Sequence, residues 1–541
     1  MGYSAHVDTF AKDHLPPQAE WPELIFKLPE LHYPERLNCA GELLDRMAEQ
    51  HPDRPCLRAP GLLWSYGQLL EQANRIAWVL TREMGLVPGN RVLLRGTNHP
   101  MLVAAWFGVM KAGGIAVTTM PLLRAKELTE VVNKAQISHA LCDIRLKEEL
   151  EQARPGCPSL EQVVYWGEGG QLEALMHRQP AHFANVETAS KDTCLIAFTS
   201  GTTGRPKGCM HFHRDVLAIC DTFARHVLRA SPDDLFTGSP PLAFTFGLGG
   251  LVLFPLRIGA SSLLLEKASP ELLLPALAEF RASVLFTSPT AYRAMAAQAS
   301  QHDLSALRKC VSAGEPLPAS TRRLWKEATG IELIDGIGAT EMLHIFISHT
   351  EEEAKPGATG KPVPGYEACI LDEQGRPLPP GQVGRLAVRG PTGCRYLADE
   401  RQRNYVQHGW NITGDAYLMD EEGYFVYQAR TDDMIVSSGY NIAGPEVEDA
   451  LLLHPAVAEC AVVGVPDPER GQIVKAFVVL RPGVAPSAEL AKELQDFVKQ
   501  KIAPYKYPRA IEFRESLPRT QTGKLQRYLL RQEAQSRGGA A

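Results

Sequence analysis

The sequence predicts an α/β protein with a large N-terminal domain of mostly parallel sheets flanked by helices and a small α+β domain at its C-terminal end. Three observations lead to this prediction. Short apolar runs alternate with helical segments, as in βαβ units. This alternation of apolar runs and helical segments changes after about residue 430. The length of 541 residues also exceeds that of one compact domain.

The expected elements of the large domain form two groups. The first group has strands at 91–96, 114–119 and 139–143, separated by helices at 101–112 and 127–135. The second has strands at 283–286 and 331–334, with helices at 291–299 and 320–328. Because parallel strands need a crossover between them, usually a helix, both groups indicate mostly parallel sheets.

The small domain has a different pattern. We expect helices at 446–454 and 488–501 and strands at 459–465 and 474–480. The polar stretch 430–433 divides the chain into predicted domains 1–431 and 432–541. A length of about 110 residues for the second domain fits the usual range.

Composition excludes several classes of protein. Hydrophobic residues make up 45% and charged residues 22%, which is the balance of a globular chain and not of a disordered one. The net charge of −6 is small for this length and argues against a general nucleic-acid binder. The eleven cysteines include no C-x-x-C pair, so we expect buried thiols in a reducing compartment and neither a disulfide framework nor a zinc site.

Two segments bear on the location of the protein. The first thirty residues carry charges and prolines in place of the apolar core of a signal peptide. The uncharged run 235–256 is long enough to raise the question of a membrane span, but Pro240, Pro241 and Pro255 interrupt it. We therefore expect a cytoplasmic protein with no membrane partner.

The most informative local pattern is the loop Thr199-Ser-Gly-Thr-Thr-Gly-Arg-Pro-Lys-Gly208, which follows the apolar run 194–198. Its glycines allow close backbone approach, its hydroxyls donate hydrogen bonds and its two cations supply charge, all of which a polyphosphate requires. It is not a Walker A motif, because glycine follows Lys207. A flexible surface loop is the alternative. The candidate phosphate contacts are Thr199, Ser200, Gly201, Thr202, Thr203, Gly204 and Lys207.

This decapeptide resembles the phosphate loop of the adenylate-forming superfamily, which contains acyl-CoA synthetases, aryl-CoA ligases, luciferases and peptide-synthetase adenylation domains. Five further motifs follow in the order of that superfamily: Ser312-Ala-Gly-Glu-Pro316, Asp335-Gly-Ile-Gly-Ala-Thr-Glu341, Trp410-Asn-Ile-Thr-Gly-Asp415, Arg430-Thr-Asp432 and Pro518-Arg-Thr-Gln-Thr-Gly-Lys524. Six motifs in a fixed order argue strongly against a match by chance. The resemblance implies that the small C-terminal domain is mobile and rotates on a hinge at Asp432.

The resemblance also implies a role for each motif. The nucleotide would contact Gly314, Glu315, Pro316, Asp335, Gly336, Asp415 and Arg430. Glu341 would bind Mg²⁺, for which a carboxylate is a suitable hard ligand, and Thr340 would donate to a phosphate. Lys524 would stabilise the charge that builds on the α-phosphate, and the pantetheine thiol would enter past Gly439. Taken singly, these residues have ordinary alternatives, such as a solvated acid, a turn cap or a surface lysine.

The implied activity overcomes the poor electrophilicity of a carboxylate. The acid attacks the α-phosphate of ATP, which gives an acyl-adenylate and pyrophosphate, and a thiol then displaces AMP to form a thioester. Positioning and electrostatics carry most of such phosphoryl chemistry. The expected cofactors are therefore ATP, Mg²⁺ and coenzyme A.

Two stretches narrow the choice of acid, because 335–346 and 241–250 resemble benzoate-CoA and 2-aminobenzoate-CoA ligases. Phenylalanine rings would give flat walls to an aromatic ring, and His344 could bond the carboxylate or an ortho substituent. Alternatively, the phenylalanine rings and His344 could have only a structural role in the packing of the core. The N-terminal stretch 21–39 favours the 2-aminobenzoate group. The expected acid pocket consists of Phe244, Phe246, Ala313, Gly338, His344 and Ile345.

One departure from the resemblance concerns the thiol. Many ligases of this kind carry lysine after the hinge, where this chain has Val436, and Asn441 stands where acetyl-CoA synthetases have arginine. Free coenzyme A is the preferred acceptor. An enzyme that loads an aryl acid onto a carrier protein, a medium-chain acyl-CoA synthetase and a catalytically silent nucleotide-binding protein stay open. Relatives make a homodimer a reasonable expectation.

Overall fold

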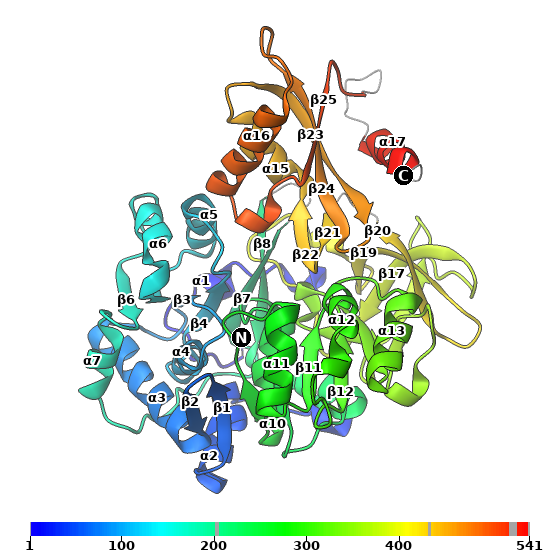
Figure 1. Cartoon of the computed structure of the whole chain (residues 1–541). Coiled ribbons are helices and arrows are strands. Elements are labelled where there is room, and N and C mark those ends of the chain that lie inside the picture. The colour runs from blue at the N-terminus through cyan, green and yellow to red at the C-terminus, as the bar shows by residue number, and fades with distance from the viewer. Residues whose placement is uncertain (1, 201–204, 431–433, 519–526, 539–541) are drawn as a thin grey trace.

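The computed structural model of the chain describes residues 2–200, 205–430, 434–518 and 527–538. Figure 1 shows a large lower part, which holds most of the helices, and a smaller upper part formed by residues after about 434. The α/β fold class that the sequence predicts is confirmed. The predicted boundary between 1–431 and 432–541 falls outside the described residues and stays a prediction.

The first sheet has six strands in the order β6-β5-β3-β4-β7-β8. Their bounds are Gln162–Trp166 (β6), His139–Asp143 (β5), Arg91–Arg95 (β3), Ile115–Thr119 (β4), Thr193–Ser200 (β7) and Pro206–Phe212 (β8). Neighbours are parallel except for β7 and β8, which pair antiparallel. Helices α4 (Pro100–Lys111) and α5 (Ala125–Ala135) connect β3, β4 and β5, so the predicted alternation is confirmed.

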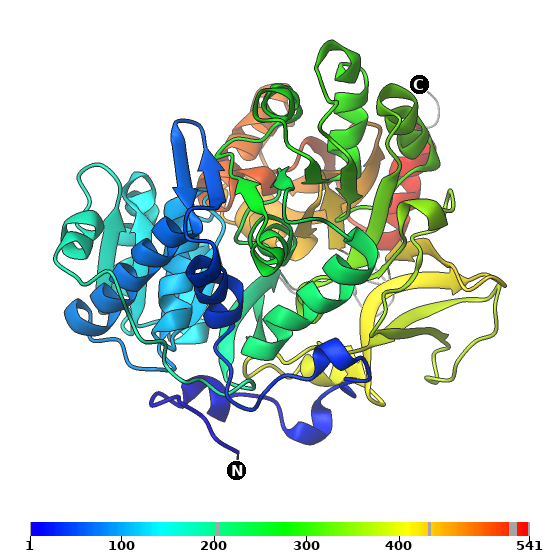
Figure 2. The same cartoon turned by 90° about the horizontal axis from the view of Figure 1, so that it is seen from below.

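The second sheet has nine strands in the order β15-β14-β13-β12-β11-β9-β10-β1-β2. Their bounds are Lys361–Pro362 (β15), Ile345–Ser348 (β14), Leu333–Gly338 (β13), Lys309–Ser312 (β12), Val284–Thr287 (β11), Leu235–Gly238 (β9), Ser261–Leu263 (β10), Pro55–Ala59 (β1) and Leu62–Ser65 (β2). The run from β13 to β1 is parallel throughout. Helices α12 (Pro289–Ala296) and α13 (Ala319–Thr329) follow β11 and β12. Figure 2 shows the blue-to-cyan segment of the chain and the green segment side by side.

An antiparallel sheet follows in the chain, drawn yellow-green to yellow at the edge of the molecule in Figure 2. Its strands are β16 (Glu367–Leu371), β17 (Val383–Arg389), β18 (Val406–Gln407), β19 (Trp410–Met419) and β20 (Phe425–Arg430). β19 pairs with three of them, so this sheet is built around one long strand.

The small C-terminal part has its own five-stranded sheet, packed with helices α15 (Gly444–Leu452) and α16 (Ala488–Lys501). Its strands are β21 (Met434–Ser437), β22 (Tyr440–Ala443), β23 (Val457–Asp467), β24 (Gly471–Leu480) and β25 (Ala510–Arg514). The two long strands were predicted shorter, at 459–465 and 474–480. Of the residues that the prediction left out, Pro466 and Gly471 are exposed, whereas Val457 belongs to the core.

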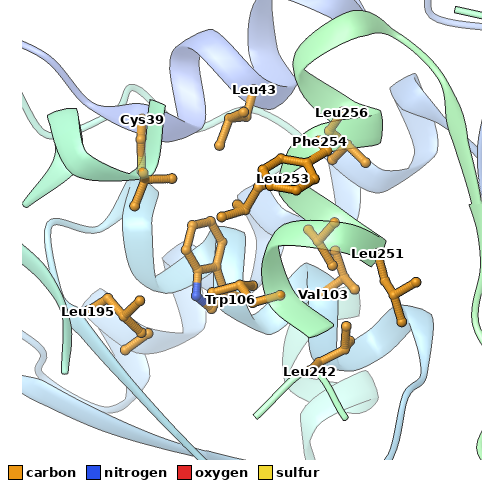
Figure 3. Close-up of a cluster of buried hydrophobic side chains, with 14 of the residues drawn as sticks. Cys39, Leu43, Val103, Trp106, Leu195, Leu242, Leu251, Leu253, Phe254 and Leu256 are labelled. Carbon is orange, nitrogen blue, oxygen red and sulfur yellow. The ribbon is translucent and has the colours of Figure 1, made fainter. Parts of the chain in front are cut away.

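Helix α4 lies inside the largest hydrophobic core, and all of its residues are buried. Figure 3 shows Trp106 of this helix among Leu195, Leu253 and Phe254, which come from distant parts of the chain. A helix that is covered on all sides has no need of a polar face. This burial fixes α4 between the first two sheets.

The uncharged run 235–256 does not form one long helix. It divides into β9, a loop and a short helical stretch made of α9 (Thr245–Leu248), a π-helix (Gly249–Leu253) and the start of α10 (Phe254–Ile258). Among the described residues, no helix is long and apolar enough to cross a membrane.

Candidate active site

A cavity of about 660 Å³ lies where strands of the two large sheets end and the small domain begins. Thr199 near the end of β7, Ala313 just after β12 and Gly338 at the end of β13 line it. The small domain contributes Tyr440 and Lys506. Open α/β sheets bind their ligands at such carboxyl ends of parallel strands, so this cavity is the candidate active site.

The structure brings many of the predicted site residues to this cavity. Those that line it are Thr199, Phe244, Phe246, Ala313, Gly314, Gly338, Thr340, His344, Ile345 and Gly439. Other predicted residues do not line it: Lys207, Glu315, Pro316, Asp335, Gly336, Glu341 and Asp415. Ser200 and Arg430 are the last residues of β7 and β20. Those outside the described residues are Gly201, Thr202, Thr203, Gly204, Asp432 and Lys524.

Two predicted glycines, one from each domain, approach each other at the cavity. A Cβ atom added to Gly314 would lie 3.8 Å from the Cα atom of Gly439. Both residues have positive φ angles, 91° and 79°, which glycine adopts without strain. The tip of the β21–β22 hairpin therefore reaches the turn after β12, and the positive φ angles mean that any other residue at either position would strain the backbone.

Glu341 is buried beside the cavity, with 7% of its surface exposed. The Tyr396 hydroxyl donates to its Oε1 atom, and Lys207 Nζ lies 3.4 Å from the same oxygen and 2.9 Å from the Tyr396 hydroxyl. Burial opposes ionisation of this carboxyl, but Lys207 and Tyr396 outweigh it, so the pKa of Glu341 falls below its ordinary value. The alternative of a solvated acid is wrong, because Glu341 is a buried carboxylate.

The donor set around Glu341 fits a hard cation such as Mg²⁺. Among the described residues, the side-chain hydrogen bonds from Lys207 and Tyr396 both fall on Oε1, which makes Oε2 the candidate ligand atom. The neighbouring residue Thr340 lines the adjoining wall of the cavity. Since Mg²⁺ keeps several waters and substrate phosphates, one or two protein oxygens are sufficient.

The backbone near Glu341 is held by a histidine that the sequence did not single out. His211 Nε2 donates a 2.8 Å hydrogen bond to the carbonyl oxygen of Thr340. Burial lowers the pKa of His211 to about 4, so the ring is neutral and its proton lies on Nε2. His211 thereby ties β8 to the turn that carries Thr340 and Glu341.

Two further predicted acids are also buried. Burial raises the pKa of Asp335 to about 7, with Arg322 acting against this rise. Asp415 lies on β19 opposite Arg430 in the strand register and is 7% exposed. The alternative of a surface turn for Asp415 is therefore wrong.

His344 lies at the aromatic end of the cavity and is 2% exposed. Its ring centroid is 5.7 Å from that of Phe246 and 4.5 Å from that of Phe254. Burial lowers the pKa of His344 to about 3, so the imidazole is neutral. A Cβ atom on Gly249 would lie 2.4 Å from the His344 ring, which explains why glycine occupies that position.

Several residues of the site were not predicted from the sequence. Tyr396 belongs to none of the six motifs, yet it bonds both Glu341 and Lys207. Tyr440 stacks on Tyr505 with ring centroids 4.4 Å apart, and both line the cavity. No local pattern marks these tyrosines, because their partners lie far away in the chain.

Comparison with known proteins gives matches over nearly the whole chain. The AMP-binding enzyme family model matches residues 44–396, and the model of the AMP-binding enzyme C-terminal domain matches residues 446–524. Benzoate–CoA ligase of Thauera aromatica is 35% identical over 516 residues, which cover 93% of this chain and 97% of that protein.

Two solved structures are also similar. The anthranilate CoA ligase AuaEII, in complex with anthranoyl-AMP, is 35% identical with a TM-score of 0.74, and the match covers 95% of this chain and 100% of that one. The amide bond synthetase McbA from Marinactinospora thermotolerans is 28% identical with a TM-score of 0.82, over 92% of this chain and 99% of that one.

Proposed function

The chain belongs to the AMP-binding enzyme family, and from this premise we propose that it activates an aromatic carboxylic acid of the benzoate or 2-aminobenzoate type. It is an adenylate-forming acyl-CoA ligase, and such ligases use ATP, Mg²⁺ and coenzyme A. The acid reacts with ATP to give an acyl-adenylate and pyrophosphate. Coenzyme A then displaces AMP and forms the aryl thioester.

The observation that carries the choice of an aromatic acid is the wall of the cavity formed by Phe244, Phe246 and His344. Phe246 and His344 lie in tilted ring contact, with 42° between their planes, and offer aromatic faces to an aryl ring. The anthranilate and benzoate ligases among the similar proteins support the same class of acid. His344 is the residue that separates the two candidates, because a neutral imidazole can accept a hydrogen bond from an ortho amino group.

We assign the remaining roles to the residues of the six motifs. Glu341 would hold Mg²⁺, which supplies charge to the phosphates when bound. Lys207 keeps the Glu341 carboxylate ionised, and Thr340 would donate to a phosphate. Lys524 would stabilise the charge that develops at the α-phosphate, and Asp432 would act as the hinge between domains 1–431 and 432–541.

The other predicted residues would contact the substrates. Thr199, Ser200, Gly201, Thr202, Thr203, Gly204, Gly314, Glu315, Pro316, Asp335, Gly336, Asp415 and Arg430 would contact the nucleotide, and Gly439 would face the pantetheine arm. Ala313, Gly338 and Ile345 would complete the acid pocket. A cytoplasmic location and a homodimer stay predictions from the sequence.

The deciding experiment measures pyrophosphate release and thioester formation with the same set of acids. The set is benzoate, 2-aminobenzoate, hydroxybenzoates, phenylacetate and medium-chain fatty acids, each with ATP, Mg²⁺ and free coenzyme A. We expect aromatic acids to give both products, with 2-aminobenzoate or benzoate turned over fastest.

Each alternative gives a different result in this experiment. Pyrophosphate without a coenzyme A thioester would indicate an enzyme that loads a carrier protein. Preference for fatty acids would indicate a medium-chain acyl-CoA synthetase. ATP binding with no pyrophosphate from any acid would indicate a catalytically silent protein.

A further inference from the structure

Cys39, Cys194 and His213 form a cluster outside the active site, and all three are completely buried. Each offers one ligand atom, a sulfur or an imidazole nitrogen, and the three atoms lie within 4.8 Å of one another. Cys39 precedes a π-helix (Gly41–Asp45), Cys194 lies near the start of β7, and His213 begins α8 (His213–Ile219). The cluster thus joins the N-terminal segment to β7 and to the start of α8, directly after β8.

The three side chains interact mainly with each other. His213 Nδ1 lies 3.2 Å from Cys39 Sγ and accepts a 3.1 Å hydrogen bond from the Cys39 amide. His213 Nε2 has no hydrogen-bond partner among the described residues. The cluster is therefore a buried group of polar side chains whose hydrogen-bonding capacity is only partly used, although buried polar atoms are normally paired.

Charge balance also favours a divalent ion at this cluster. A buried thiolate without a counter-charge is costly. Two thiolates and a divalent cation are together neutral, which removes this cost.

We propose that Cys39, Cys194 and His213 bind a thiophilic divalent metal ion of the Zn²⁺ class. Two sulfurs and one imidazole nitrogen are ligands that Zn²⁺ prefers. In a tetrahedral zinc site, with Zn–S of about 2.3 Å and Zn–N of about 2.0 Å, ligand atoms are about 3.5 to 3.8 Å apart. Since the ligand atoms lie within 4.8 Å of one another, closing the cluster around the ion requires them to approach each other by up to about 1.3 Å.

The cysteines lack C-x-x-C spacing, which predicted that the chain has no zinc site. Cys39 and His213 are 174 positions apart, so no local pattern marks the cluster. The ion would tie the N-terminal segment to β7, the strand whose last residues, Thr199 and Ser200, begin the predicted phosphate loop. The ion would stabilise this connection between the N-terminal segment and β7. The proposed metal site does not depend on the proposed function.

The test uses the full-length protein, treated with a chelator under reducing conditions and then titrated with Co²⁺ and Zn²⁺. We expect one equivalent of Co²⁺ to produce a thiolate-to-cobalt charge-transfer band that Zn²⁺ abolishes by displacement. The variants Cys39→Ala and Cys194→Ala should lose the band. Cys142→Ala is the matched control, since Cys142 is also buried, on β5, but lies outside the cluster, and it should keep the band.

Three outcomes would overturn the proposal. One is the absence of the band in the wild-type protein, which requires no variant to fold. Another is a band of equal strength in Cys39→Ala and Cys194→Ala. The third is a Cys39–Cys194 disulfide that persists under the reducing conditions and withholds both sulfurs from the metal.

Discussion

Lys506 of the small domain donates a 2.8 Å hydrogen bond to Glu127 at the start of helix α5 in the large domain. The same ammonium group donates a 2.6 Å bond to Glu446 of its own domain, and Glu127 also accepts from the Ala503 amide. Lys506 and Glu127 are both less than 10% exposed. One buried cation thus joins two carboxylates across the domain boundary, at the edge of the candidate active site.

Replacing Lys506 with methionine should destabilise the protein. The change leaves Glu127 and Glu446 buried without their cation, and breaking a buried ion pair costs about 3 kcal/mol or more. Urea unfolding measures the loss. Lys499→Met is the control, because Lys499 forms a pair with Asp496 at the surface, and such pairs contribute less than about 1 kcal/mol. Equal losses in the two variants would contradict this assignment.

The same cluster predicts a dependence of stability on pH. Burial, together with the charge of Glu127 and against the attraction of Lys506, raises the pKa of Glu446 from 4.5 to about 7. Because the folded state binds this proton more tightly, the Glu446 contribution favours folding at low pH and is lost as pH rises from about 4.5 to 7, by up to about 3 kcal/mol.

The check is a comparison of wild type with Glu446→Gln, which cannot titrate at this position. Free energies of unfolding measured from pH 4.5 to 7.5 should converge at low pH, with the wild type falling below the variant as pH rises. A constant difference across this range would refute the elevated pKa.

Tyr396→Phe tests the support of the Glu341 carboxylate. The variant loses the hydroxyl that donates to Glu341 and accepts from Lys207. Loss of such a supporting group costs about 10-fold or more in metal affinity, so half-maximal pyrophosphate release should require about 10-fold more Mg²⁺. Tyr405→Phe is the control, because its hydroxyl is buried next to Tyr396 but bonds no described residue. An unchanged Mg²⁺ requirement in Tyr396→Phe would argue against metal binding by Glu341.

His344→Phe separates a substrate contact from a packing role. If the imidazole accepts a hydrogen bond from an ortho amino group, the variant should lose about 10-fold in kcat/KM for 2-aminobenzoate. This loss corresponds to one hydrogen bond of about 1.5 kcal/mol. The value for benzoate should change much less. A parallel fall for both acids would show that His344 only supports the pocket wall.

Lys524→Ala tests the proposed catalytic lysine, which lies outside the described residues. Stabilisation of developing charge at the α-phosphate is worth about 3 to 4 kcal/mol, so pyrophosphate release should fall about 100-fold to 1000-fold. Unfolding by urea should stay as in wild type. Lys501→Ala, at the exposed end of α16, should leave the rate unchanged, and a normal rate in Lys524→Ala would exclude the assignment.

The sequence alone predicted what depends on neighbours in the chain. Apolar runs and helical spacing placed β3, β4, β5, β11 and β13 within a few residues, but they did not mark every strand of the two sheets. The order of six motifs indicated the family, because each motif is a turn or loop whose glycines and polar groups lie within about ten positions. Pro240 and Pro241 also predicted correctly that the run 235–256 forms no spanning helix, whereas the helical stretch 245–258 continues through Pro255.

Tertiary structure alone decided which distant side chains meet. Tyr396 with Glu341, Lys506 with Glu127, and Cys39 with His213 are pairs separated by 55 to 379 positions. Their energies come from burial and charge in a shared low-dielectric space, which exists only after the sheets have packed. For the same reason the cysteine spacing argued against a zinc site while the folded chain collects two thiols and an imidazole at one point. Local pattern fixes the elements, and close packing of those elements creates the chemistry between them.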